Sequence, residues 1–196
     1  LTLSQLEKGG YPHFMLKEIE EQPNVVRRLI STYFDGEDIK IDQELIDVLK
    51  AAKKINFVAA GTSRYASYMG KYYFEKLCSI PSEVLQASEL VYSTPLIVGS
   101  PVFIFLSQSG ETADSIAVMK NVRKKGFKMV LITNNMNSTM ADLADFCLDI
   151  YAGPEISVAS TKAYVAQVVT MSILAKAVSG VITKLKNHLQ TIAIKM

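Results

Sequence analysis

FIFLSQSGET, residues 103–112, is the stretch that decides the fold, because a short apolar run ends there in a loop of hydroxyl groups. The apolar part suits a strand buried on both faces, and the residues that follow have the spacing of a helix. The first N–H groups of a helix have no internal partner, and the peptide dipoles place partial positive charge there. Hydroxyl and amide groups add uncharged donors, and none is a strong nucleophile without a base. The stretch therefore predicts that a phosphate is held here rather than attacked.

The composition describes an α/β protein of one domain. The chain has 196 residues, of which 49% are hydrophobic and 20% charged, so it is long enough to bury a full core. Its formal net charge is +2, with no polybasic run, which predicts neither a nucleic-acid partner nor a membrane partner. No metal is expected, because Cys78 and Cys147 lie far apart without a second Cys or His at metal spacing.

Four further features of the sequence bear on the location and the extent of the protein. The two cysteines are interpreted as reduced, buried thiols of a cytoplasmic protein. Residues 1–12 are polar and contain two glycines, so no signal peptide is expected, and the apolar segment 163–178 is interpreted as a core helix. The chain begins with Leu rather than Met, which suggests a fragment of a longer protein.

Helices are predicted in the first fifty residues and an alternation of strands and helices after them. We expect helices over 14–21 and 24–33, a loop over 35–38, and a helix capped by Asp42 that runs to residue 54. The later alternation argues for a parallel sheet covered by helices. The expected strands are 55–60, 82–86, 102–106, 128–133 and 146–151. The expected helices among and after them end at residues 77, 92, 125, 144 and 179, and a last one covers 181–194.

Three polar loops connect the carboxyl end of a strand to a helix, at residues 61–63, 107–112 and 157–162. In open parallel sheets ligands bind in the crevice outside those strand ends. All three loops are therefore expected to converge on one phosphorylated small molecule. Ser63, Ser107, Ser109 and Thr112 are the candidates for contact with its phosphate.

Helix capping is the competing interpretation of these loops, since Ser and Thr are preferred at helix starts. The hydroxyl density of residues 107–112 exceeds what one cap needs, so phosphate binding is favoured there. Capping is favoured for each of the other two loops taken singly. Lys162 and Glu111 are interpreted as solvated surface charges.

Motifs for other chemistries are missing. The chain has no G-x-G-x-x-G spacing, no G-x-x-x-x-G-K-[ST] and no G-x-S-x-G elbow, so neither a cofactor nor a hydrolase triad is predicted. His13 and His188 lie at the two ends of the chain and are interpreted as surface or interface residues.

A family resemblance joins these motifs. AGTS (60–63), SQSGET (107–112) and VASTK (158–162) together resemble the signature of a sugar isomerase (SIS) domain. The lead-in EKGGYPHFMLKEIEEQP (7–23) resembles the segment that enters the isomerase half of the glutamine–fructose-6-phosphate aminotransferases, the glucosamine-6-phosphate synthase family. The resemblance covers nearly the whole chain.

The resemblance implies a three-layer αβα sandwich with a five-stranded parallel sheet that binds a hexose 6-phosphate. It divides the chain into a helical lead-in (1–50), an SIS domain (51–180) and a C-terminal helix (181–196). The ligands that it implies are fructose 6-phosphate and glucosamine 6-phosphate. By this resemblance the phosphate is held by Ser63, Ser107, Gln108, Ser109 and Thr112. The residues assigned to the sugar are Thr62 and Val158, with Ser160 and Lys162 in the same loop as Val158.

The same resemblance implies that no catalytic residue lies in this chain. The family enzyme carries a glutaminase domain before two tandem SIS domains, and its isomerisation groups belong to the second SIS domain and the C-terminal tail. The chain is therefore expected to bind phosphosugar without converting it, and to form a homodimer.

Two other functions stay open. A stand-alone phosphosugar isomerase would need its own base, for which Glu89 or Glu155 could serve. A regulatory sensor, of the kind fused to helix-turn-helix repressors, is the alternative without catalysis. The lead-in argues against the sensor, because it resembles the synthase and not a DNA-binding domain.

Overall fold

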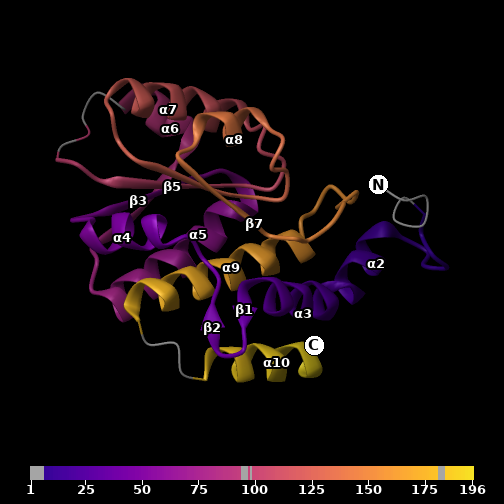
Figure 1. The fold of residues 1–196 in the computed structure, drawn as a ribbon. Coiled ribbons are helices and arrows are strands. Elements are labelled where there is room, and N and C mark those ends of the chain that lie inside the picture. Colours follow the sequence, from indigo (N-terminus) through magenta and orange to yellow (C-terminus); the bar gives the residue numbers. More distant parts are fainter. Residues whose placement is uncertain (1–6, 94–96, 98, 181–183) are drawn as a thin grey trace.

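A five-stranded parallel sheet lies between two layers of helices (Figure 1). The computed structural model describes residues 7–93, 97, 99–180 and 184–196. The sheet order is β4-β3-β5-β6-β7, and every neighbouring pair in it is parallel. The strands are β3 (Ile55–Ala59), β4 (Ser82–Gln86), β5 (Val102–Ser107), β6 (Met129–Thr133) and β7 (Phe146–Asp149). The predicted α/β sandwich with five parallel strands is confirmed.

Alternate side chains of β5 enter two different cores, because successive residues of a strand point to opposite faces. Ile104 and Leu106 belong to the larger core, whereas Phe103 and Phe105 belong to the smaller one. The larger core is covered by α3 (Gln22–Tyr33), α4 (Gln43–Ala51), α5 (Gly61–Tyr73), α9 (Lys162–Ser179) and α10 (Leu185–Lys195). The smaller core is covered by α6 (Ala87–Ser93), α7 (Ala113–Lys124) and α8 (Thr139–Leu143).

The arrangement of these helices creates a topological switch point between β3 and β5. The two strands are neighbours, yet α5, which follows β3, covers one face of the sheet, and α7, which follows β5, covers the other. Connections that diverge in this way mark the point where ligands bind in open α/β sheets. The fold thus brings the first two polar loops to the same edge of the sheet, at the place where a ligand crevice is expected.

Several boundaries differ from the sequence prediction. The expected loop over 35–38 is part of an antiparallel hairpin of β1 (Phe34–Asp35) and β2 (Asp38–Ile39), which forms because Phe34 and Ile39 both pack on the larger core. The helix expected to reach residue 77 ends at Tyr73 and continues as a π-helical turn, η1 (Phe74–Cys78). This wider turn leaves Phe74 fully buried against Phe57, with ring centroids 5.8 Å apart.

Other predictions concern the ends of the chain and its cysteines. The first helix of the described residues is α2 (Phe14–Glu20), and Asp42 caps α4 as predicted. Residues 1–6 of the lead-in and 181–183 of the last predicted helix lie outside the described residues, and α10 begins at Leu185. Cys78 and Cys147 are free but only half-buried. In the described parts of the chain, no helix has the length and hydropathy needed to cross a bilayer.

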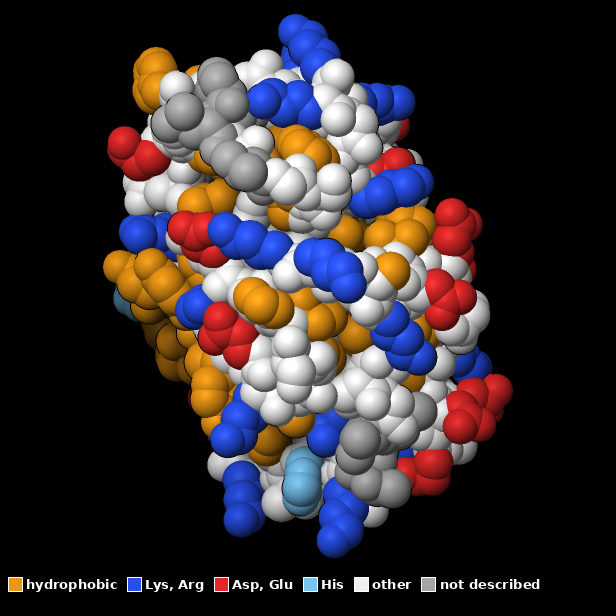
Figure 2. Space-filling model, turned by 90° about the vertical axis from the view of Figure 1, so that its left-hand side faces the viewer, with side chains coloured by type: hydrophobic (Ala, Val, Ile, Leu, Met, Phe, Trp, Pro, Cys, Tyr) orange, Lys and Arg blue, Asp and Glu red, His pale blue; other side chains and the backbone are white. Residues whose placement is uncertain are grey.

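The edge that carries the amino ends of the strands faces the viewer in Figure 2. Lysine and arginine side chains are scattered over it, with acidic side chains between them, and they do not gather into one basic patch. This edge lies opposite the polar loops, and the mixed charges of the visible face give no sign of a polyanion site there.

Gly70→Ala is expected to lower the free energy of unfolding by about 1–3 kcal/mol, although alanine favours helices more than glycine does. A Cβ atom at Gly70 would lie 2.5 Å from the Met171 sulfur and 2.9 Å from a Phe57 ring carbon, where α5 packs on α9. Urea denaturation followed by circular dichroism measures the change. An unchanged or higher midpoint would show that the contact between α5 and α9 can relax without cost.

Candidate functional site

The loop after β5 folds back on its own serine side chains. Ser107 is the last residue of β5 and is only 3% exposed. Its Oγ accepts the N–H of Gly110 at 3.0 Å and lies 2.9 Å from Thr112 Oγ1. Ser109 Oγ accepts the N–H of Glu111 at 3.2 Å. A tight turn therefore places the hydroxyl groups of this loop beside the start of α7.

Residues 134–140, which run from the end of β6 into α8, hold the carbonyl groups of this turn. The carbonyl oxygen of Gln108 accepts the backbone N–H of Asn134 at 3.1 Å, and that of Gly110 accepts the N–H of Met140 at 3.1 Å. The carbonyl oxygen of Ser109 accepts the Asn135 side-chain amide at 3.3 Å. Because these three carbonyls point toward the 134–140 segment, the negative ends of their peptide dipoles face away from the crevice, which favours an anion there.

Ser63, Ser107 and Ser109 each accept a hydrogen bond from the protein, and hydroxyl hydrogens in this group are left for a ligand. Ser107 and Ser109 accept backbone N–H groups, and Ser63 Oγ accepts the Gln167 side-chain amide at 2.9 Å. Within the described ranges, the hydroxyl hydrogens of Ser63 and Ser109 have no protein acceptor. The pair Ser107 and Thr112 shares one hydrogen between its two oxygens, so a further one stays free. Donors without an acceptor suit an anionic ligand.

The two helices that begin at the crevice have no side-chain cap. Neither Ala60, the N-cap of α5, nor Thr112, the N-cap of α7, accepts a hydrogen bond from its helix through a side chain. By contrast, Asp42 caps α4 and Ser138 caps α8. The capping role favoured for the 61–63 loop is therefore wrong, because the residue at the cap position is an alanine. The first N–H groups of α5 and α7 stay available to a ligand.

The third loop, by contrast, is occupied by a carboxylate of its own. Glu155 accepts the N–H of Thr161 at 2.8 Å, the N–H of Ala163 at 3.2 Å and the Ser160 hydroxyl at 2.9 Å. Glu155 thus caps the start of α9, whereas the serine or threonine cap favoured from the sequence is wrong, because Thr161 at the N-cap position makes no side-chain cap hydrogen bond. Val158 lies fully exposed at the tip of this loop.

Lys162 is not the solvated surface charge that the sequence indicated. It is 3% exposed, and its Nζ lies 2.5 Å from Glu21 Oε2. A lysine can be buried in this way only because a carboxylate partner 141 residues away in the sequence neutralises it. The prediction is wrong because no residue close to Lys162 in the sequence indicates its partner Glu21.

The structure brings the first loop next to both of the others. The pairing of Val58 with Phe105 places the ends of β3 and β5 side by side, so Ser107 lies beside the residues that open α5. The hydrogen bond between Ser63 and Gln167 joins the first turn of α5 to the second turn of α9. Gln167 was not predicted as a site residue, although the single side-chain amide of a mostly apolar helix is a signal that could have indicated it.

The candidate bases of the alternative isomerase lie apart from the hydroxyl loop. Glu155 is engaged by its own loop, and Glu89 is exposed on α6. His13 precedes α2 and His188 is exposed on α10. None of these four side chains hydrogen bonds to residues 107–112 in the described parts of the chain. The geometry therefore suits binding better than proton transfer.

Glu111 links the hydroxyl loop to α8 and gives this contact a pH dependence. Its Oε1 accepts the N–H of Thr139 at 2.7 Å, and hydrogen bonding to Thr139 lowers the pKa of Glu111 below 4.5. A lowered pKa means that the contact contributes stability above pH 4.5 and loses it as the pH falls through the folded value. We expect Glu111→Gln to flatten the pH dependence of unfolding below pH 4.5. Equal slopes for the two proteins in acid urea titrations would contradict this.

Fold and site together define a doubly wound α/β protein with a strand-end site suited to an anion. The chain belongs to the SIS domain family, which matches residues 48–177. This confirms the family expected from the three loop motifs. The family match begins after α2 and α3, so it does not include the lead-in helices.

The chain also has close relatives among the glutamine–fructose-6-phosphate aminotransferases. The chain is 51% identical over 180 residues to the glutamine–fructose-6-phosphate aminotransferase (isomerizing) of Staphylococcus aureus, and 51% identical over 189 residues to that of Staphylococcus epidermidis. These matches cover 91% and 96% of this chain, respectively, and the chain spans about 30% of the length of these relatives. Among solved structures, the C-terminal domain of the Francisella tularensis glucosamine-fructose-6-phosphate aminotransferase is similar, with a TM-score of 0.86 and 34% identity. That match covers 96% of this chain and 55% of the other.

Proposed function

We propose that this chain is the phosphosugar-binding first SIS domain of a glucosamine-6-phosphate synthase, an aminotransferase of amino-sugar biosynthesis. Such an enzyme converts fructose 6-phosphate and glutamine into glucosamine 6-phosphate and glutamate. The names of the relatives support the reaction. The observation that carries the binding role is the set of hydroxyl hydrogens on Ser63, Ser109 and the Ser107–Thr112 pair that no protein group accepts among the described residues.

The proposed ligand lies across the crevice with its phosphate over the start of α7. Ser63, Ser107, Gln108, Ser109 and Thr112 hold the phosphate by hydrogen bonds, assisted by the uncapped first turns of α5 and α7. Thr62, Val158 and Ser160 contact the sugar. Ser160 already donates its hydroxyl to Glu155, so it would serve the sugar as an acceptor.

The chemistry itself is assigned to parts of the protein outside this chain. The proposal places ammonia release in a glutaminase domain and isomerisation in a second SIS domain. It also keeps the homodimer and the division at residues 50 and 180 that the sequence resemblance implies, together with the cytoplasmic location expected from the two cysteines. Purified chain supplied with fructose 6-phosphate and ammonia is expected to form no glucosamine 6-phosphate, and detectable product would contradict this assignment.

Calorimetric titration tests the binding role. Fructose 6-phosphate and glucosamine 6-phosphate are expected to bind, whereas fructose is not. Ser109→Ala is expected to weaken binding about 10-fold or more, because a hydrogen bond to a charged group contributes about 1.5–3 kcal/mol. Ser31→Ala is the matched control, since Ser31 is an exposed serine of α3 whose hydroxyl donates to the Arg28 carbonyl. Equal binding of fructose, or unchanged affinity in Ser109→Ala, would overturn the phosphate site.

A further inference from the structure

Glu18 of α2 reaches out of the lead-in and holds the third loop. Its side chain is 2% exposed. Oε1 accepts the N–H of Ile156 at 2.5 Å and the N–H of Ser157 at 3.1 Å, and the Ser157 hydroxyl donates to Oε2. Both oxygens of this buried carboxylate are therefore engaged by two consecutive residues of one loop, 138 residues away in the sequence.

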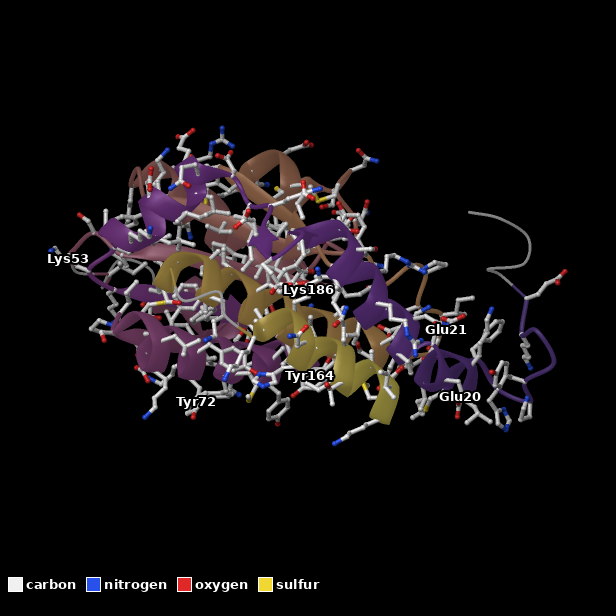
Figure 3. All side chains as sticks on the ribbon, turned by 60° about the horizontal axis from the view of Figure 1, so that its bottom comes forward. Glu20, Glu21, Lys53, Tyr72, Tyr164 and Lys186 are labelled. Carbon is white, nitrogen blue, oxygen red and sulfur yellow. The ribbon has the colours of Figure 1, made fainter. Side chains whose placement is uncertain are left out.

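Glu21 holds the other end of the same loop. It lies between α2 and α3, and its Oε2 lies 2.5 Å from Nζ of Lys162, whose side chain is 4% exposed. Figure 3 shows Glu21 directed toward the 153–161 segment, whereas Glu20, the preceding residue, points away from it. Glu18 thus holds the loop at residues 156–157 and Glu21 holds it at Lys162. The exposed Val158 lies between these two contacts.

The chemistry of these contacts favours a role in geometry over one in stability. Burying a carboxylate or an ammonium costs free energy that hydrogen bonds and pairing only offset, and apolar residues of similar size often stabilise a protein as well or better. Charged groups instead determine geometry, because a carboxylate fixes the orientation of the N–H groups from which it accepts hydrogen bonds. A binding loop held in its bound conformation avoids the ordering cost that a free loop pays on association.

We propose that Glu18 and Glu21 are positioning residues that fix residues 156–162 for the sugar portion of the ligand. This inference rests on the proposed function. The two glutamates act through the loop and do not touch the ligand themselves. The phosphate is held by a different loop, on β5 and α7, so the lead-in governs recognition of the sugar and leaves recognition of the phosphate unchanged. The lead-in, which lies outside residues 48–177, is in this sense part of the site.

The test compares two ligands on one variant. Glu18→Gln preserves the size of the side chain but replaces one acceptor oxygen by an amide that cannot accept the N–H groups of the loop. Glu20→Gln is the matched control, an exposed glutamate two residues further along α2. Fructose 6-phosphate and inorganic phosphate are titrated separately into each protein and followed by backbone amide NMR shifts, which report millimolar affinities.

We expect Glu18→Gln to weaken fructose 6-phosphate binding about 10-fold while inorganic phosphate binding stays within 2-fold of the parent chain. Glu20→Gln should change neither. If the contact of Glu18 with the loop merely stabilises the fold, Glu18→Gln will lower the affinities for both ligands together. That result, or no change in either affinity, overturns the inference. If the parent chain binds neither ligand, the proposed function is wrong. If the parent chain binds both ligands but Glu18→Gln does not have the expected effect, only the positioning role of Glu18 is wrong.

A charge exchange covers the case in which Glu18→Gln does not fold. Glu21→Lys is expected to weaken fructose 6-phosphate binding, because it places two ammonium groups at the end of the loop. Adding Lys162→Glu restores an ion pair with the two charges exchanged. The double variant should recover at least half of the change in log Kd for fructose 6-phosphate that Glu21→Lys causes. Absence of recovery in a folded double variant would overturn the positioning role of Glu21.

Discussion

Gly110→Ala is expected to abolish phosphate binding and to lower the free energy of unfolding by about 3 kcal/mol. Gly110 has a φ of +69°, a conformation that costs a residue with a Cβ atom about 1–2 kcal/mol. An added Cβ would also lie 2.1 Å from Ser138 Oγ and 2.5 Å from Ser138 Cβ. Ser138 cannot move aside easily, because it is buried and caps α8 through the N–H of Ala141. The loop must therefore shift, and its hydroxyl groups shift with it.

Gly126→Ala separates the cost of the positive φ from the cost of the close contact with Ser138. Gly126 has a φ of +74°, close to that of Gly110, but no atom lies within 4 Å of the position of its Cβ. Gly126→Ala should therefore lower the free energy of unfolding by only about 1 kcal/mol, and the variant should bind phosphate like the parent chain. Calorimetric phosphate titration and urea denaturation of both variants check this. Equal losses of stability in the two variants, with phosphate binding intact in Gly110→Ala, would contradict the close approach of the 107–112 loop to α8.

Glu21→Gln is expected to destabilise the chain more than Lys162→Met does, although both remove the same ion pair. The glutamine variant leaves the Lys162 ammonium buried, with a side chain that is only 4% exposed, and an unpaired buried charge costs about 3 kcal/mol. The methionine variant instead leaves Glu21, which is 34% exposed and can be hydrated, with Lys17 Nζ 3.9 Å from its Oε1. Its loss should be about 1 kcal/mol or less, because methionine fills the space of the lysine stem.

Urea denaturation of both variants measures the difference. Lys53→Met is the control for removal of a lysine charge, since Lys53 is exposed and lies at the opposite end of the molecule from Glu21 (Figure 3). It should change the free energy of unfolding by less than about 0.5 kcal/mol. If Lys162→Met lowers the free energy of unfolding as much as Glu21→Gln or more, then loss of the ion pair itself dominates the effect. The cost of leaving the Lys162 ammonium buried without a carboxylate would then be minor.

The fold could be predicted from the sequence because its determinants are local. The alternation of short apolar strands with longer amphipathic segments needs only the spacing of neighbouring residues, and it placed β4 at the right residues and β5 to within one residue. The 107–112 loop was likewise recognisable, because a strand end, a glycine and several hydroxyl groups follow one another within ten residues. Boundaries that the pattern missed, such as η1 and the β1–β2 hairpin, depend on packing against the larger core.

The sequence by itself thus determined a parallel α/β sheet, its strand-end loops and the chemistry of the central loop. Only the tertiary structure decided which helices lie on each face and therefore where the crevice opens. It also decided that Ser63 is paired with Gln167, that Glu18 holds Ile156 and that Lys162 is buried against Glu21. These partners are 104, 138 and 141 residues apart. A charge or amide in one segment has no local signature of its partner in another, because burial and pairing arise only when the chain is folded.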